Sequence, residues 1–108
     1  SGWIMSHLSH SYHAGACLYF TFAFKAGEKP DAEYALVKTA IQQAFVDAGG
    51  TLSHHHGVGM EHAPWMEQVV STEGVALMRS LFDAADPGAH LNPGKVIDAP
   101  LTLFDNLE

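Results

Sequence analysis

The sequence predicts an α+β fold, a small antiparallel sheet with helices packed on one face. Three observations indicate this: the alternating apolar run "ACLYFTFAF", an apolar stripe at helical spacing over residues 34–48, and a second helical pattern after Ser71. Together they give the order β-β-α-β-α, which is typical of helices covering one side of a sheet. The 108 residues suffice for one domain with a modest core.

Two strands are expected near the N-terminus, in "WIMSHLS" and "ACLYFTFAF". Alternation in the second strand separates two faces. The predicted core face is Leu18, Phe20, Phe22 and Phe24. The smaller and more polar face is Cys17, Tyr19, Thr21 and Ala23. The intervening "SHSYHAG" is expected to be a loop that turns at Gly15.

The next segments are expected to form a helix and a short third strand. Asp31 is a candidate N-cap, and the apolar stripe of the helix ends at Gly49 and Gly50, since glycine accepts the left-handed conformation of a helix end. "TLSHH" is expected to be the strand, with its histidines at the rim of the sheet because "GVG" follows directly.

The last third of the chain is expected to be helical. Pro64 begins a short turn that bears Trp65 and Val69. Ser71 caps the last helix, which "DP" at residues 86–87 stops. The buried face of that helix is predicted to be Val75, Met78, Phe82 and Ala85.

Composition excludes some classes of function. Five basic and twelve acidic residues give a net charge of -7, which argues against a nucleic-acid partner because phosphates require clustered Lys and Arg. The single cysteine, Cys17, excludes an internal disulfide and suits a reducing compartment. The longest apolar run is about half of a membrane-spanning helix. We therefore expect a cytoplasmic protein, free or peripheral to a membrane.

Eight histidines in 108 residues suggest proton transfer or metal binding. Spacing of three on a strand followed by a loop does not put His7, His10 and His13 on one face. His7, His62 and His90 are interpreted as surface or loop imidazoles. For His10 and His13, which precede the Tyr19 strand, a surface role and a site role remain open.

The run "SHHHGVG" has a more specific geometry. In an extended segment His54 and His56 point one way and His55 the other, so the three cannot ligate one metal from a regular strand. No cysteine lies nearby, although a zinc site that draws on both histidine clusters remains an alternative. The glycines allow a ligand to approach the backbone, which favours a histidine-lined cleft for a polar or anionic substrate.

Three stretches together resemble a known family: "SHSYHAGACLYFTFAF" (residues 9–24), "GGTLSHHHGVG" (49–59) and "FDAADPGAHLNPGKVI" (82–97). They resemble the FAD-linked oxidases of the vanillyl-alcohol oxidase superfamily, in the last, ferredoxin-like part of the C-terminal substrate domain. The branch they resemble is the alkyldihydroxyacetonephosphate (alkylglycerone-phosphate) synthases. Residues 1–97 would then be the C-terminal portion of that domain, and residues 98–108 a tail.

This resemblance implies an enzyme of ether-lipid synthesis that uses FAD without net redox change. Such an enzyme exchanges the acyl chain of acyl-dihydroxyacetone phosphate for a long-chain alcohol. The chain is then expected to be a C-terminal fragment, inactive alone, with an FAD-binding domain upstream in the same polypeptide. A homodimer is also expected, because apolar surface would be exposed where the missing part docks.

The resemblance also assigns roles to residues. It implies that Tyr19 is the catalytic acid/base and that His55 and His56 are catalytic hydrogen-bond donors and proton relays. The remaining implied site residues are His54, His10 and His13 for substrate and Asn92 and Lys95 for cofactor, with no metal.

Two departures from the family pattern keep an alternative open. Met60, Glu61 and Ala63 stand where related sequences carry basic residues that would suit the substrate phosphate. "LNPGK" also resembles the branch that oxidises D-lactate, glycolate or D-2-hydroxyglutarate, although a glutamate metal ligand of that branch is replaced by His55. An FAD-dependent 2-hydroxy-acid oxidase or dehydrogenase is therefore the second hypothesis, and a histidine-rich metal-binding domain is the third.

Overall fold

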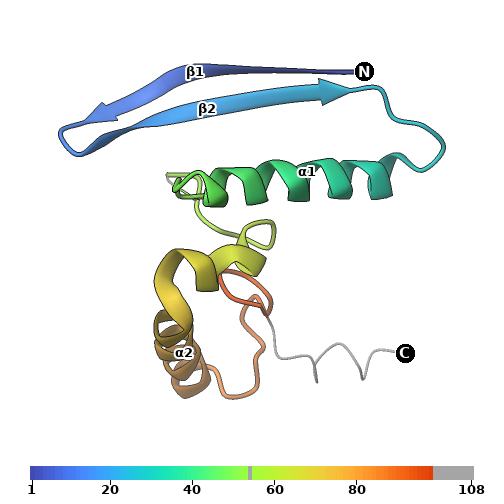
Figure 1. The fold of residues 1–108 in the computed structure, drawn as a ribbon. Coiled ribbons are helices and arrows are strands. Elements are labelled where there is room, and N and C mark those ends of the chain that lie inside the picture. Colours follow the sequence, from blue (N-terminus) through green and yellow to red (C-terminus); the bar gives the residue numbers. More distant parts are fainter. Residues whose placement is uncertain (54, 99–108) are drawn as a thin grey trace. The chain divides into compact units, whose positions relative to one another are not determined.

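The computed structural model describes residues 1–53 and 55–98 (Figure 1). Its elements, in order, are β1 (Gly2–Tyr12), β2 (Gly15–Phe24), α1 (Pro30–Asp47), the 3-10 turn η1 (Ala63–Trp65) and α2 (Met66–Ala85). The chain divides into two compact units, Ser1–Ile41 and Gln42–Glu108. The predicted α+β class is confirmed. None of the helices described is long and apolar enough to cross a membrane.

The first unit is built on an antiparallel hairpin of β1 and β2 (Figure 1). Both strands are longer than predicted, because the chain reverses in two residues, His13 and Ala14, between the paired Tyr12 and Gly15. Most of "SHSYHAG", which we expected to be a loop, is therefore strand. A two-residue connection leaves every flanking residue free to join the ladder, and that outcome is not visible in composition.

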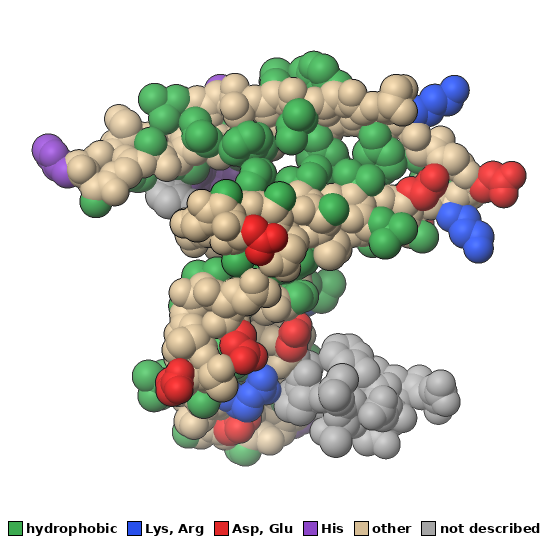
Figure 2. Space-filling model, viewed as in Figure 1, with side chains coloured by type: hydrophobic (Ala, Val, Ile, Leu, Met, Phe, Trp, Pro, Cys, Tyr) green, Lys and Arg blue, Asp and Glu red, His purple; other side chains and the backbone are tan. Residues whose placement is uncertain are grey.

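The predicted core face of β2 is covered only at one end. Phe22 is half-buried, with its ring 6.1 Å from the ring of Tyr34 and 5.9 Å from the Lys38 ammonium of α1. Towards the turn, Leu18 is 55% exposed and Phe20 37% exposed. Figure 2 shows apolar side chains gathered along the hairpin. The prediction of a continuous core face was therefore wrong at Leu18 and Phe20.

Helix α1 begins at Pro30 rather than after an Asp31 cap. Proline is favoured in the first helical turn because its missing N–H has no partner there in any case. At the other end Gly49 has φ +82° and donates its N–H to the Val46 carbonyl at 2.9 Å. Gly50 donates to the Phe45 carbonyl, also at 2.9 Å, which completes a Schellman motif. The predicted glycine end of the helix is confirmed.

The second unit has a small core centred on Trp65. Its buried apolar residues are Ala63, Trp65, Met66 and Ile97. The indole N–H of Trp65 donates to the Gln43 side-chain oxygen at 3.0 Å, which satisfies the one polar group of that ring. The predicted helical turn at Pro64 is confirmed as η1, whereas Val69 is 38% exposed.

Helix α2 contains a kink at Ser71, which has φ 74° and ψ 166°. The Ser71 hydroxyl accepts a hydrogen bond from the Gly74 N–H at 3.2 Å, so the predicted cap is confirmed even though the two helical pieces run on without a loop. Val75 and Met78 are half-buried, whereas Phe82 and Ala85 are exposed. Only the first half of the predicted apolar face is therefore covered.

The segment after α2 is held by the carboxylate of Asp86. It accepts hydrogen bonds from the Leu91 N–H at 2.7 Å and the His90 N–H at 3.1 Å. These two bonds, first that of Leu91, hold the pKa of Asp86 below its usual range. The Arg79 side chain donates a hydrogen bond to the Asp98 carbonyl at 3.2 Å, and Ile97, the residue before Asp98, is buried. The end of this segment therefore packs against its own unit through Ile97 and through the bond from Arg79.

The kink predicts an unusual ranking of substitutions at Ser71. Ser71→Ala loses the cap and keeps a Cβ in a region of φ/ψ space that only glycine adopts easily, so it should lower the free energy of unfolding by about 1 kcal/mol. Ser71→Gly also loses the hydroxyl but relieves the backbone, and it should be more stable than Ser71→Ala. Urea denaturation measures both, and equal stabilities would contradict the assigned backbone strain.

Asp86→Asn should lower the melting temperature at neutral pH, because a neutral amide accepts the two N–H groups less strongly. The folded pKa of Asp86 is depressed, so its contribution is present above the unfolded pKa of about 3.8 and is lost as pH falls through the folded value. The difference between wild type and variant should therefore shrink on acidification below about pH 4. Thermal melts at pH 7 and pH 3 test this, with the exposed neighbour Asp83→Asn as control. A difference that grows in acid would refute it.

Candidate functional site

The register of the hairpin decides which side chains lie beside Tyr19. From the turn, Tyr12 pairs with Gly15, Ser11 with Ala16 and His10 with Cys17. A bulge then follows between Leu8 and His10, so that Leu8 pairs with Leu18 and His7 with Tyr19. A ladder without the bulge would have placed Leu8 opposite Tyr19. The extra residue, Ser9, therefore changes the partner of the phenol.

The bulge also puts His7 and His10 on one face of the hairpin. Residues directly opposite each other in a ladder share a face, and Cys17 and Tyr19 are two residues apart on β2. The expectation that the three-residue spacing separates these histidines was wrong, because Ser9 reverses the alternation of β1. The alternation of residues along β1 alone does not show where such a bulge lies.

Ring contacts follow this register. The His7 and Tyr19 rings are 5.3 Å apart between centroids, tilted by 34°. His10 and Tyr12 are stacked at 6.3 Å, and the Nδ1 of His10 shares a hydrogen bond of 2.7 Å with the Ser9 hydroxyl. Tyr19 is 41% exposed, so the face with its phenol and imidazoles is open. Sequence reasoning assigned His7 to the surface and missed its contact with the phenol.

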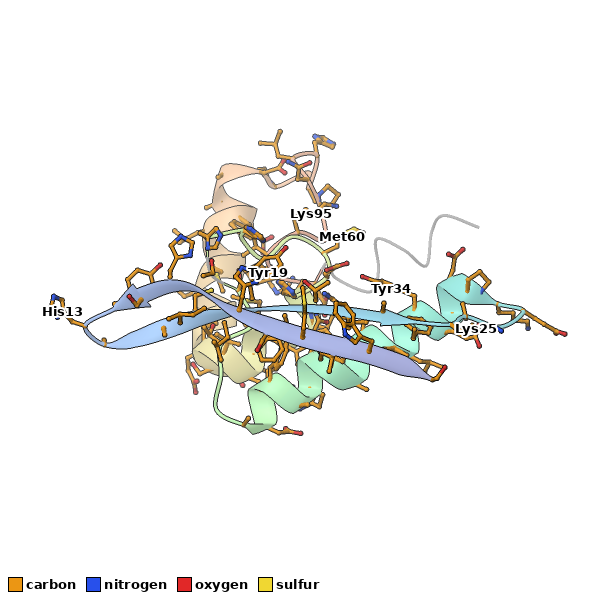
Figure 3. All side chains as sticks on the ribbon, turned by 90° about the horizontal axis from the view of Figure 1, so that it is seen from above. His13, Tyr19, Lys25, Tyr34, Met60 and Lys95 are labelled. Atoms are coloured by element: carbon orange, nitrogen blue, oxygen red, sulfur yellow. The ribbon has the colours of Figure 1, made fainter. Side chains whose placement is uncertain are left out.

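His13 lies apart from these residues. It occupies the two-residue turn at the tip of the hairpin, whereas Tyr19 lies near the middle of β2 (Figure 3). His10, expected in a loop, is instead a strand residue opposite Cys17. Within the hairpin, the structure therefore brings together Tyr19, His7 and His10 but not His13.

The two described histidines of the second unit's run, His55 and His56, are not in a strand. His55 and His56 lie in a turn, and among the described residues only β1 and β2 form a sheet. Their rings meet edge to face at a centroid distance of 4.3 Å and an angle of 73°. The expectation that successive imidazoles point to opposite sides was therefore wrong for this pair, because a turn does not alternate as a strand does. His54 lies outside the described residues.

The glycines after this run shape the loop. Gly57 has φ +82° and Gly59 φ +60°, both in the left-handed region that favours glycine. Among the described residues, no heavy atom beyond the chain neighbours lies within 4 Å of the position that a Cβ would take at Gly57 or Gly59. The backbone next to His55 and His56 is therefore bare and open, which is the property that the sequence predicted for close approach by a ligand.

The loop is tied to the third motif by the backbone. Val96 donates its N–H to the Gly59 carbonyl at 2.9 Å, and Lys95 is exposed beside it; Figure 3 shows Lys95 near Met60. Asn92 and Val96 have φ 51° and 70°, which is uncommon for residues with a side chain and an outlier for a β-branched one. The structure thus joins "HHHGVG" to "NPGKV" within one unit.

The predicted site residues therefore fall into two sets. Tyr19, His10 and His13 belong to the first unit, and His55, His56, Asn92 and Lys95 to the second. A phenol among imidazoles can take and return a proton, and paired imidazoles beside bare backbone can donate hydrogen bonds to carbonyl, carboxylate or phosphate oxygens. Both kinds of group suit acid/base chemistry on an oxygen-rich substrate.

Several known proteins are similar in sequence to this chain. An alkyldihydroxyacetonephosphate synthase of Dictyostelium discoideum is 45% identical over 96 residues, which cover 88% of this chain and 16% of that protein. The synthase of Trypanosoma brucei brucei is 37% identical over 101 residues, covering 93% of the chain and 16% of the relative. A glycolate oxidase subunit of Bacillus subtilis is 40% identical over 63 residues, covering 52% of the chain and 13% of that subunit.

The chain thus spans about one sixth of the length of the synthases that it matches. The model of one protein family, described as FAD linked oxidases, C-terminal domain, matches residues 1–96. That match takes in the hairpin, the histidine loop and the turn that carries Asn92 and Lys95. The chain therefore belongs to the family of FAD-linked oxidase C-terminal domains.

Proposed function

We propose that the full-length protein carrying this chain is an FAD-dependent enzyme of the alkyldihydroxyacetonephosphate synthase type. It would exchange the acyl chain of acyl-dihydroxyacetone phosphate for a long-chain alcohol. The observation that carries the proposal is the phenol of Tyr19, exposed on a hairpin face that also presents the imidazoles of His7 and His10. The identity of 45% to a synthase over most of the chain supports this choice of reaction.

The described residues suit the isoalloxazine ring of FAD and not its phosphates. The open backbone at Gly57 and Gly59, beside the His55–His56 pair, leaves room for a flat polar ring. Asn92 and Lys95 lie in the segment tied to that loop and would hold the cofactor there. The unit has only Arg79 and Lys95 as basic residues, so the pyrophosphate would be held by an FAD-binding domain elsewhere in the same polypeptide. When bound, FAD would supply an electrophilic ring that activates the dihydroxyacetone carbon.

Tyr19 would move the proton at that carbon. A phenol both donates and accepts a hydrogen bond, so it can remove the proton and return it to the same atom. Its exposure leaves the hydroxyl within reach of a substrate. The open face would exclude water once a substrate with a long alkyl chain covers it, which strengthens each hydrogen bond made there.

His55 and His56 would donate hydrogen bonds to substrate oxygens. Imidazole N–H groups stabilise charge that develops on a carbonyl or carboxylate oxygen during the exchange. The edge-to-face contact holds the two rings at different angles, so that they donate in different directions. His54, His10 and His13 complete the proposed set of substrate-binding residues. Of these, His10 has the most support, because it lies on the same face of the hairpin as Tyr19.

The substrate phosphate needs a cation, and the segment after the histidine loop supplies none. Ala63 is only 4% exposed and belongs to the core, so this position offers no surface for a phosphate. Met60 is 62% exposed but uncharged. Lys95 is exposed and precedes Val96, whose N–H bonds the Gly59 carbonyl of the loop. Lys95 is therefore the cation that the proposal assigns to this end of the loop. A remote part of the polypeptide would supply further charge.

The apolar alcohol also bears on location and assembly. A long alkyl chain partitions into a lipid surface, so we place the enzyme in the cytoplasm and peripheral to a membrane. Apolar side chains on the hairpin, including Trp3, Ile4 and Leu18, are more than half exposed and would be covered by the rest of the polypeptide or by a second copy in a homodimer.

A second candidate is oxidation of a D-2-hydroxy acid by the same flavin. The 40% identity to a glycolate oxidase subunit over 52% of the chain favours it. It requires removal of a hydride or of a proton and two electrons from the hydroxyl-bearing carbon, with net reduction of FAD. The exchange reaction leaves the flavin oxidised at the end of each turnover, and this difference separates the two candidates.

Tyr19→Phe in the full-length protein should lower acyl-for-alkyl exchange at least about 100-fold, because a group that transfers a proton typically contributes that much. Flavin content should stay unchanged, since the ring and its packing remain. Tyr34→Phe is the matched control, because it also removes one phenol hydroxyl and keeps its stack on Phe22. Exchange that survives in Tyr19→Phe would sink the assignment.

Addition of D-lactate, glycolate or D-2-hydroxyglutarate under anaerobic conditions should leave the flavin absorbance of the wild-type protein unchanged. Bleaching of the flavin by one of these acids, together with absence of exchange activity, would decide for the oxidase instead.

A further inference from the structure

We propose that His7 is a positioning residue for Tyr19: its imidazole holds the phenol ring in the orientation that proton transfer requires. The inference rests on the proposed function, because it assigns His7 a role through the acid/base group of that reaction. Its basis is the contact between the two rings, 5.3 Å between centroids, across one rung of the hairpin.

His7 lies opposite Tyr19 because of the bulge. Without Ser9 as an extra residue, Leu8 would lie opposite Tyr19 and His7 opposite Phe20. With it, residues 2–8 present their other face, so that His7 meets the phenol and Leu8 meets Leu18. Bulges redirect side chains next to active sites, and this one places a planar ring rather than a branched aliphatic chain against Tyr19.

The contact with His7 bears on the orientation of Tyr19 because this side chain is not fully buried. It lies on a two-stranded hairpin and is 41% exposed. On such a hairpin the side chain directly opposite is the nearest one, and the diagonal partners are farther away. For Tyr19 the diagonal positions on the same face are Met5 and His10, opposite Thr21 and Cys17.

The chemical requirement is positional. A proton returns to the atom it left only if the hydroxyl stays at hydrogen-bond distance from it, and a displacement of about 1 Å can cost about 100-fold in rate. A tilted ring contact, at 34° here, restricts rotation of the phenol about its side-chain bonds. The shape of the imidazole is therefore the property that matters, and another flat ring should replace it.

The test uses three variants of the full-length flavin-loaded protein. His7→Ala removes the ring and should lower kcat for exchange roughly tenfold while KM changes less than about twofold, since only the geometry of proton transfer is disturbed. His7→Phe keeps a flat ring and should restore kcat to within about threefold of wild type. Ser6→Ala, the neighbouring residue on the other face of β1 opposite Phe20, is the control and should have no effect.

A readout without turnover separates positioning from loss of fold. With 3-fluorotyrosine at position 19, the fluorine resonance should shift and narrow in His7→Ala, because the ring gains freedom, and should stay broad in His7→Phe. Flavin absorbance and melting temperature should be the same in all three variants. An unchanged resonance and unchanged kcat in His7→Ala would overturn the proposal, as would equal losses in His7→Ala and His7→Phe.

The failure of this inference differs from that of the proposed function. If Tyr19→Phe retains exchange, the role of Tyr19 itself falls, and that of His7 falls with it. If Tyr19→Phe loses exchange while His7→Ala keeps full activity and an unchanged resonance, Tyr19 stands and only the positioning role of His7 is refuted.

Discussion

The bulge at Ser9 is the constraint on which the candidate chemistry of the hairpin depends. One extra residue between Leu8 and His10 exchanges the faces of residues 2–8 relative to β2. It gives the phenol of Tyr19 an imidazole neighbour and gathers apolar Ile4 and Leu8 opposite Phe22 and Leu18. A single backbone irregularity thereby gives the hairpin one face with the Tyr19 phenol and the imidazoles of His7 and His10 and another face that is mainly apolar.

In the second unit the corresponding constraint is a set of backbone hydrogen bonds. Asp86 holds the N–H groups of His90 and Leu91, and Val96 donates to the carbonyl of Gly59. The strained φ of Val96 persists because its N–H is bonded and Ile97 beside it is buried in the core with Trp65. The loop that follows His55 and His56 is therefore joined at Gly59, by one backbone hydrogen bond, to a residue much later in the chain, Val96.

Much of this architecture could be predicted from local pattern. The alternation of β2, the glycine end of α1, the turn at Pro64 and the cap at Ser71 follow from propensity and capping, which act over a few residues. The alternation also indicates that Tyr19 lies on the more polar face of β2, whereas its choice as the acid/base group comes from the family resemblance.

The features that the sequence did not predict depend on how the two strands of the hairpin pair. The bulge, the length of β1 and the contact of His7 with Tyr19 are set by the register between two strands, which no single strand encodes. The expected strand "TLSHH" failed for a related reason: its described residues, 51–53 and 55, pair with no strand among the described residues and have no strand structure. The open face at Leu18 and Phe20 likewise depends on what else packs there, a property beyond periodicity.

The central claim is that the Tyr19 phenol removes and returns a proton at the dihydroxyacetone carbon. Its most direct test is incorporation of solvent deuterium at that carbon when the full-length protein turns over acyl-dihydroxyacetone phosphate in deuterium oxide, followed by mass spectrometry. Deuterium should enter the product with the wild-type protein, whereas Tyr19→Phe, with its flavin still bound, should incorporate none. Equal deuterium incorporation by the two proteins would contradict it.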